Sequence, residues 1–166
     1  AGRARSHLLL EVLTPIAKSW PSEWCLEANS LAIQVLGGYG YTRDFPVEQY
    51  WRDNRLNMIH EGTHGIQALD LLGRKIMQLQ GAGMRRFLAL IQKFCETHAT
   101  TPEMIEFILP LAEVTKQWGE LTMEIGRKSS SNADEMGAAA VDYLFYSGYV
   151  TLAYWWARSV ATAEAG

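Results

Sequence analysis

The stretch QVLGGYGYTRDFPVEQYWRDNRLNMIHEGTHGIQ, residues 34–67, decides the fold. It opens at the end of a helix that Gly37 and Gly38 are expected to stop, because glycine accepts the left-handed conformation found at helix ends. A turn-rich connection follows, and a second helix is predicted over residues 47–58. The helical pattern is interrupted again at residues 60–63, before a third helix begins. The stretch therefore predicts short helices joined by turns.

Both flanks of this stretch also favour helices. On the N-terminal side, Thr14-Pro15 and Ser22 are typical helix starts. On the C-terminal side, Thr63 is placed to cap a helix with one apolar stripe at spacings of three and four. The stripe consists of Ile66, Leu69, Leu72, Ile76 and Leu79.

The second half of the chain is predicted to be helical as well. Residues 80–83, Gln-Gly-Ala-Gly, are the expected boundary between two lobes. Three further helices are expected: from Met84 to Thr97, from Thr101 to about Arg127, and from the Asp134 region onward. No run alternates long enough to predict a strand. We predict an all-α helical bundle over residues 1–80, followed by an additional C-terminal helical domain over residues 84–166.

Composition restricts the class of protein. The chain has 166 residues, of which 48% are hydrophobic and 20% are charged, so it is expected to fold rather than to stay disordered. Fifteen basic residues against eighteen acidic ones leave no surplus for neutralising phosphates, which argues against a nucleic-acid partner. Cys25 and Cys95 have no companion ligands and are expected to be reduced thiols.

The apolar run over residues 138–157 is long enough to be a candidate membrane span. It contains Asp142 and four tyrosines, which do not suit the centre of a bilayer. We expect no transmembrane segment and predict a long, mostly buried helix. Its aromatic residues are expected in the core or at helix interfaces. They are Tyr143, Phe145, Tyr146, Tyr149, Tyr154, Trp155 and Trp156.

Several features could carry chemistry, each with a plain structural alternative. The glycines at 37–40 end a helix, or they allow a ligand to approach the backbone. The pair His60 and His64 superficially matches a zinc motif, but a helix break lies between them, so no metal site is expected. Glu61 is a helix-terminal charge or a general base in a cleft. The charged run at residues 52–55 is a solvated helix face or a binding surface.

Taken in order, these elements resemble the C-terminal helical domain of the acyl-CoA dehydrogenases. The family pattern is a Gln, a Gly pair, a turn, an aromatic or Pro-rich helix start, an Arg-Asp pair, an Ile-x-Glu-Gly-Thr element and a closing Ile-Gln. All of these are present in residues 34–67. The resemblance covers residues 13–76. Residues 84–166 are similar in placement and helical character to the extra region of larger members, such as the very-long-chain type and the methylthiopropionyl-CoA type.

The resemblance implies a reaction. Glu61 matches the catalytic base, which removes a proton from Cα of a fatty acyl-CoA while a hydride leaves Cβ for N5 of FAD, giving the trans-2-enoyl-CoA. A carboxylate shut into a dry cleft gains basicity, which suits this role. The resemblance also implies that the backbone N–H of Glu61 and the flavin ribityl group donate to the thioester carbonyl.

The resemblance further implies where the cofactor and substrate bind. The segment Gln34, Val35, Leu36, Gly37 and Gly38 matches the part that lines FAD across the subunit interface. Gly62 matches a backbone contact with acyl-CoA, and Thr63, His64 and Gly65 match a turn that contacts FAD. Many relatives carry Gln or Glu where this chain has Gly65, so that contact is expected from the backbone only.

A chain of this length is too short for a whole acyl-CoA dehydrogenase, and we expect it to be a fragment that is inactive by itself. The implied partners are acyl-CoA, an electron-transfer flavoprotein and further copies in a homodimer or homotetramer. The expected location is the bacterial cytoplasm, or the mitochondrial matrix for a eukaryotic source. The alternative is a non-catalytic helical interaction module that kept the family scaffold, and such a module would be expected to lose Glu61 or the Gly pair first.

Overall fold

The computed structural model describes residues 2–164, with side chains from Ser6 onward. These residues are almost entirely helical, and no strand occurs among them, which confirms the predicted all-α fold. The elements in chain order are α1 (Gly2–Leu36), the 3₁₀ helix η1 (Gly37–Tyr41), α2 (Val47–Leu56), α3 (His64–Leu69), the π-helical segment η2 (Asp70–Gln78), α4 (Ala82–His98), the 3₁₀ turn η3 (Pro102–Met104), α5 (Ile105–Ser129) and α6 (Asp134–Glu164).

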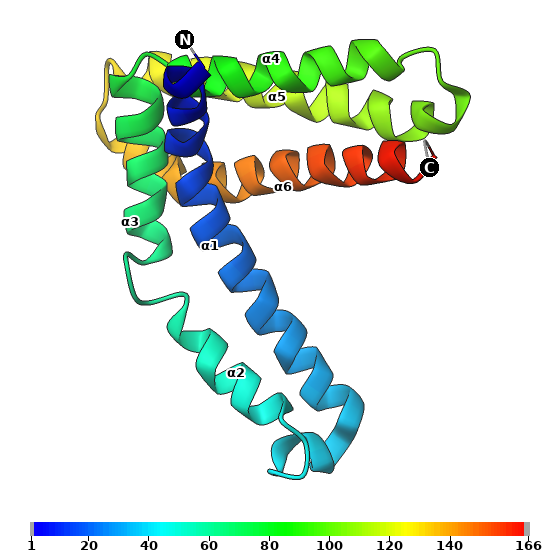
Figure 1. Ribbon diagram of the computed structural model, residues 1–166. Coiled ribbons are helices and arrows are strands. Elements are labelled where there is room, and N and C mark those ends of the chain that lie inside the picture. The colour runs from blue at the N-terminus through cyan, green and yellow to red at the C-terminus, as the bar shows by residue number, and fades with distance from the viewer. Residues whose placement is uncertain (1, 165–166) are drawn as a thin grey trace.

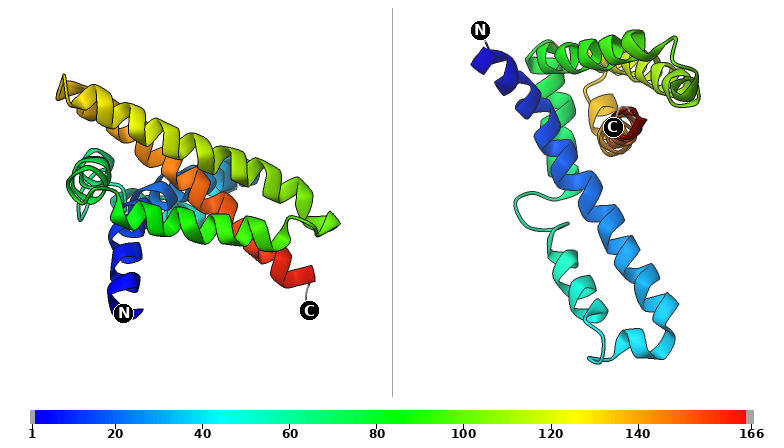
Figure 2. Two further views of the ribbon diagram at one scale, coloured as in Figure 1. Left: turned by 90° about the horizontal axis from the view of Figure 1, so that it is seen from above. Right: turned by 45° about the vertical axis from the view of Figure 1, so that its right-hand side comes forward.

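The molecule has two regions of different character (Figure 1). Helices α4, α5 and α6 pack with α3, η2 and the first half of α1, and together they form what we call the bundle. The second half of α1 turns back through η1 into α2, and this hairpin projects away from α4–α6. We call it the arm, residues 23–59. A second view of the ribbon shows the same projection (Figure 2).

The bundle has a continuous apolar core. Trp118, Tyr143 and Phe87 are its largest fully buried side chains, and their rings meet at centroid distances of 6.2 Å (Phe87 to Trp118) and 6.4 Å (Trp118 to Tyr143). The same cluster includes Val12 of α1 and Leu72 of η2, so residues on both sides of the 80–83 connection share one core. The division into two domains at this connection stays a prediction.

Helix α1 is longer than predicted. The starts expected at Thr14-Pro15 and at Ser22 are wrong, because α1 runs unbroken from Gly2 to Leu36 with Pro15 and Pro21 inside it. A proline inside a helix costs about 3 kcal/mol, because it lacks an N–H and clashes with the preceding turn. Thr14 and Ser22 instead donate their hydroxyls to the helix carbonyls of Leu10 and Ser19, at 2.7 Å and 2.8 Å. Burial of Pro15 in the bundle offsets part of the cost.

Helix α1 crosses α6 at a glycine. A Cβ on Gly148 would lie 1.9 Å from Cδ1 of Trp20, a distance that no side chain tolerates. The indole of Trp20 also packs edge-on against Tyr149, with ring centroids 5.5 Å apart. Gly148 therefore sets how closely α1 approaches α6.

The helix after Thr63 differs from its predicted stripe. Leu72 and Ile76 are buried as expected, but Ile66, Leu69 and Leu79 are exposed, at 61%, 50% and 44%. The buried face is the one that packs against α1 and α6, and Asp70–Gln78 within this region is π-helical. The buried side chains of this region are Ala68, Leu71, Leu72, Lys75 and Ile76.

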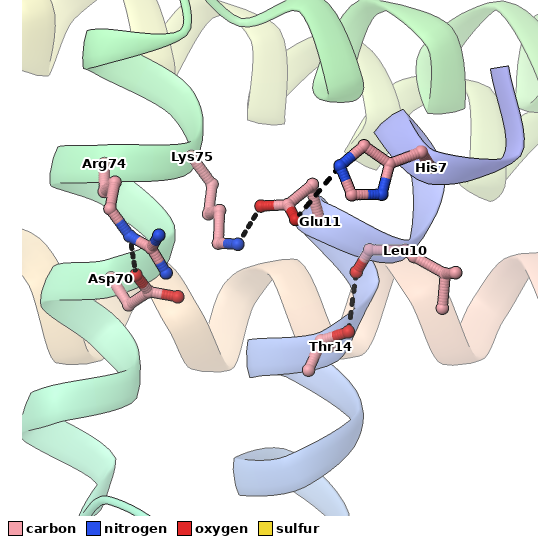
Figure 3. A network of polar contacts seen from close by, with 7 residues as sticks. All are labelled: His7, Leu10, Glu11, Thr14, Asp70, Arg74 and Lys75. Atoms are coloured by element: carbon pink, nitrogen blue, oxygen red, sulfur yellow. Dashed lines mark hydrogen bonds and ion pairs between the residues drawn. The ribbon is translucent and has the colours of Figure 1, made fainter. Parts of the chain in front are cut away.

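Lys75 enters the core because it has a charged partner there. Its ammonium binds the carboxylate of Glu11 on α1, and His7 lies 3.6 Å from the same carboxylate (Figure 3). Asp70 and Arg74 pair on the neighbouring turn. Because a buried charge is tolerated only when it is paired, this contact ties η2 to the first half of α1.

The prediction for the aromatic series of α6 is only partly correct. Tyr143 and Tyr154 are buried in the core, and Tyr149, although 50% exposed, packs against Trp20 at the interface with α1, as predicted. Trp155 and Trp156 are exposed at 46% and 68%. The guanidinium of Arg158 covers the ring of Trp155 at 4.8 Å, which shields one face of that ring. Within residues 2–164, no helix is both long and apolar enough to span a membrane.

Candidate functional site

Glu61 lies in a strained turn between the arm and the bundle. Its φ is +54°, and the φ of Gly62 is +98°. A residue other than glycine rarely takes a positive φ, because this backbone conformation costs roughly 1–3 kcal/mol. Such strain persists only where the surroundings enforce it, and it concentrates at functional sites. The predicted break at residues 60–63 is therefore present, with an unusual backbone at its centre.

Two side chains hold consecutive carbonyls of this turn. Gln67 Nε2 donates to the Glu61 carbonyl at 2.9 Å. Lys18 Nζ, from the middle of α1, donates to the Gly62 carbonyl. Backbone carbonyls in the turn are thus bonded by side chains from two different helices, which fixes both peptide planes.

The opposite groups of the turn are free. Among residues 2–164, no hydrogen bond is formed by the amides of Glu61, Gly62 and Thr63, nor by the Glu61 carboxylate. The Glu61 side chain is exposed in this chain, so the dry surroundings expected for a base do not come from these residues alone. The turn presents three N–H donors and one carboxylate to whatever lies against it.

His64 follows the turn, and its ring faces inward. Its Nε2 lies 3.0 Å from Oε2 of Glu23 on α1, and its ring packs edge-on against Phe145 of α6 at 5.5 Å. Its side chain is 17% exposed. His64 therefore anchors the start of α3 to α1 and α6, and it offers a possible ligand its backbone rather than its ring.

A pocket of about 320 Å³ lies beside Glu61, between α1 and the end of the arm. Its wall combines charged, polar and small side chains from α1 and from the residues around the turn. They are Ala17, Lys18, Pro21, Ser22, Cys25, Asn54, Asn57, His60 and Glu61. Glu61 and Lys18 thus border the same space.

The predicted cofactor segment Gln34–Gly38 lies at the tip of the arm, at the other end of α2 from Glu61 (Figure 1). Val35 is 85% exposed, and Gly37 has a φ of +60° that ends α1. A Cβ on Gly38 would meet nothing within 4 Å. The chain therefore does not bring this segment to its own Glu61.

The remaining predicted residues surround the turn. Thr63 is the N-cap residue of α3, as expected, but its hydroxyl makes no capping bond. Gly65 faces open space. The Nδ1 of His60 lies 2.8 Å from the Leu56 carbonyl oxygen. Within the described part of the chain, no three side chains of the metal-binding types gather into a site.

Lys18 and Glu23 were not predicted as site residues. Both reach the turn from α1, over sequence separations of 44 and 41 residues. No local pattern marks such contacts, because they depend on how α1 packs against α3.

The all-helical fold and its Glu-Gly-Thr turn are consistent with a C-terminal acyl-CoA dehydrogenase domain. A family model described as acyl-CoA dehydrogenase, C-terminal domain, matches residues 2–77. A second, described as acetyl-CoA dehydrogenase C-terminal like, matches residues 87–166. The chain belongs to the acyl-CoA dehydrogenase family.

Curated relatives carry related names. A 3-methylmercaptopropionyl-CoA dehydrogenase of Ruegeria pomeroyi is 42% identical over 54% of this chain and 15% of the relative. A broad-specificity linear acyl-CoA dehydrogenase of Mycobacterium tuberculosis is 28% identical over 93% of this chain and 26% of the relative. A butyryl-CoA dehydrogenase of Syntrophomonas wolfei is 23% identical over 92% and 30%. The chain thus spans between 15% and 30% of these relatives' length.

Proposed function

We propose that this chain is the C-terminal helical part of an FAD-dependent acyl-CoA dehydrogenase, with Glu61 as the base that removes the Cα proton of acyl-CoA. The supporting observation is the turn itself. Its backbone is strained and held from two helices, while the Glu61 carboxylate makes no internal contact. A carboxylate that makes no internal contact and stands on a fixed backbone is available for proton transfer to a ligand.

The free amides suit the same reaction. As a proton leaves Cα, negative charge develops on the thioester oxygen, and fixed N–H donors stabilise it. The N–H of Glu61 is assigned to this oxygen, and the backbone of Gly62 is assigned to the acyl-CoA. When FAD is bound, it supplies the acceptor for the hydride that leaves Cβ. The product is the trans-2-enoyl-CoA.

The arm tip suits a cofactor held by a neighbouring subunit. Gln34, Val35, Leu36, Gly37 and Gly38 lie far from Glu61 of the same chain, and the space over Gly38 is open to an approaching ligand. Thr63, His64 and Gly65 would contribute backbone donors near Glu61. We assign both segments to FAD. Residues 63–65 would contact the FAD that lies beside Glu61 of the same chain, and residues 34–38 would contact the FAD of a neighbouring subunit in a homodimer or homotetramer. An electron-transfer flavoprotein is the proposed electron acceptor, and the bacterial cytoplasm is the proposed location.

The experiment uses the full-length protein that contains this chain. Acyl-CoA substrates of graded chain length are mixed with it anaerobically, and the flavin absorbance and product masses are followed. Bleaching of the flavin, with a product lighter by two hydrogens, is the expected result. Absence of both with every substrate would contradict the proposal. By itself, the 166-residue chain is expected to bind no stoichiometric FAD, which its absorbance spectrum reports.

A non-catalytic interaction module is the second candidate. The exposed apolar side chains of the arm favour it, because such patches often mark protein contacts. They include Leu31, Val35, Tyr39, Tyr41, Tyr50 and Leu56. This function predicts a full-length protein that assembles with a partner but binds no flavin.

A further inference from the structure

Lys18 is the residue that links α1 to the strained turn. We propose that Lys18 is a positioning residue, whose ammonium holds the Gly62 carbonyl and thereby keeps Glu61 and the neighbouring amides in their working orientation. The inference rests on the proposed function, since it assigns a role to Lys18 in that same site. Lys18 lies outside the turn and the predicted cofactor segments.

The orientation follows from peptide geometry. A trans peptide is planar, and its C=O and N–H point in opposite directions. Because Lys18 fixes the Gly62 carbonyl, it also fixes the direction of the Thr63 N–H. Gln67 fixes the Glu61 carbonyl in the same way, and hence the Gly62 N–H. The N–H groups of Gly62 and Thr63 therefore point away from the helices that hold the turn.

Lys18 must act on the turn because the turn does not hold itself. Glu61 has a φ of +54°, which an unrestrained glutamate leaves for the right-handed region. Within the described residues, no backbone hydrogen bond is donated by residues 61–63. Gln67 comes from the helix that follows the turn directly, whereas Lys18 comes from α1, 44 residues away from Gly62. Lys18 thus links the turn directly to α1.

The link is charged and partly shielded. The contact of Lys18 with Gly62 is partly buried, and a hydrogen bond from an ammonium is stronger than one between neutral groups. Glu23 forms a second link from α1, to His64 at 3.0 Å, on the other side of Thr63. The Glu23 link holds the start of α3, and the Lys18 link holds the turn.

The test compares Lys18→Met, which removes the donor and keeps the aliphatic stem, with Lys18→Arg, which keeps a donor. Lys93→Met, an exposed lysine of α4, is the matched control. In the full-length protein, Lys18→Met is expected to lower kcat by ~10- to 100-fold with little change in KM, because the reacting groups are misplaced while binding persists. Lys18→Arg should restore most of kcat, and Lys93→Met should match the wild type.

The second readout is independent of activity. In the 166-residue chain, NMR chemical shifts of the Glu61 Cα and Cβ and of the Gly62 carbonyl carbon report the turn. They are expected to change in Lys18→Met, stay near wild type in Lys18→Arg, and stay unchanged in Lys93→Met. Unchanged shifts in Lys18→Met would overturn the inference, as would a rise in KM without a fall in kcat.

The two proposals fail differently. If the wild type oxidises no acyl-CoA, the proposed function fails, and the shifts alone decide whether Lys18 holds the turn. If Glu61→Gln abolishes turnover while Lys18→Met leaves kcat and the shifts unchanged, only the role of Lys18 fails. If Lys18→Met does not fold, a wild-type kcat in Lys18→Arg supports the inference, and a kcat in Lys18→Arg that has fallen ~10-fold or more overturns it.

Discussion

The bundle and the arm are built from the same kind of helix but are stabilised by different contacts. In the bundle, Trp118 and Tyr143 are at most 1% exposed and meet in one apolar core. In the arm, α2 has no buried residue, and the pairing of α2 with α1 relies on polar side chains. Trp51 Nε1 donates to Ser30 Oγ at 2.9 Å, and the side-chain amides of Asn29 and Asn54 meet at 3.1 Å.

The difference shows where this chain depends on other surfaces. The bundle contains the buried apolar core, so it is expected to determine most of the folding free energy. The arm leaves large apolar side chains such as Val35 and Tyr41 exposed, at 85% and 80%. Glu61 lies where the two regions join, which places the proposed base on the bundle side and the proposed cofactor segment at the arm tip.

Removing a core ring should produce the largest loss of stability. Trp118→Ala is expected to lower the free energy of unfolding by about 3–5 kcal/mol, because it leaves a cavity between Phe87 and Tyr143. The matched change in the arm, Val35→Ala, should stay within about 0.5 kcal/mol. Urea unfolding followed by circular dichroism measures both. Equal losses of unfolding free energy in the two variants would mean that the arm contributes to stability as much as the bundle does.

A smaller loss is expected where α1 crosses α6. Gly148→Ala should cost about 1–3 kcal/mol, because its methyl group would overlap the Trp20 indole. Gly137→Ala is the control on the same helix, where a Cβ would meet nothing within 4 Å. That change should stabilise by up to about 1 kcal/mol, since alanine favours helices more than glycine. A neutral Gly148→Ala in thermal unfolding would show that α1 can shift away from α6.

The smallest expected difference is between the reactivities of the two cysteines, and measuring it needs no substitution. Burial raises the pKa of the Cys95 thiol in the bundle, so a smaller fraction is thiolate at a given pH. Cys25 is exposed in the arm. Maleimide at neutral pH should therefore label Cys25 faster than Cys95. Raising the pH should reduce the difference between the two labelling rates. Faster labelling of Cys95, read by peptide mass, would contradict the burial of the bundle.

Local signals were enough to predict the helix ends. Gly37 stops α1, and the break at residues 60–63 lies where the sequence indicates, because turn chemistry acts over a few residues. The continuity of α1 through Pro15 was missed, since packing in the bundle offsets the helix-breaking tendency of proline. The π-helical segment η2 was also missed, and its buried face packs against α1 and α6 and includes Lys75, which pairs with Glu11.

The candidate site divides in the same way. Glu61 and Gly62 could be predicted because the Glu-Gly-Thr element is contiguous in sequence. Their positive φ values, the Lys18 contact and the inward-facing ring of His64 could not, because they arise from α1 and α6 packing against α3. The sequence therefore indicates the proposed base, and the tertiary structure supplies the contacts that are proposed to orient it.

Glu61 is proposed to act as the base at the junction of bundle and arm. This role is tested by kcat for acyl-CoA oxidation by the full-length Glu61→Gln variant, with an artificial electron acceptor. Glu27→Gln, which changes an exposed carboxylate of α1, is the matched control. We expect kcat to fall at least about 100-fold in Glu61→Gln and to stay unchanged in Glu27→Gln. An unchanged kcat in Glu61→Gln would contradict this role.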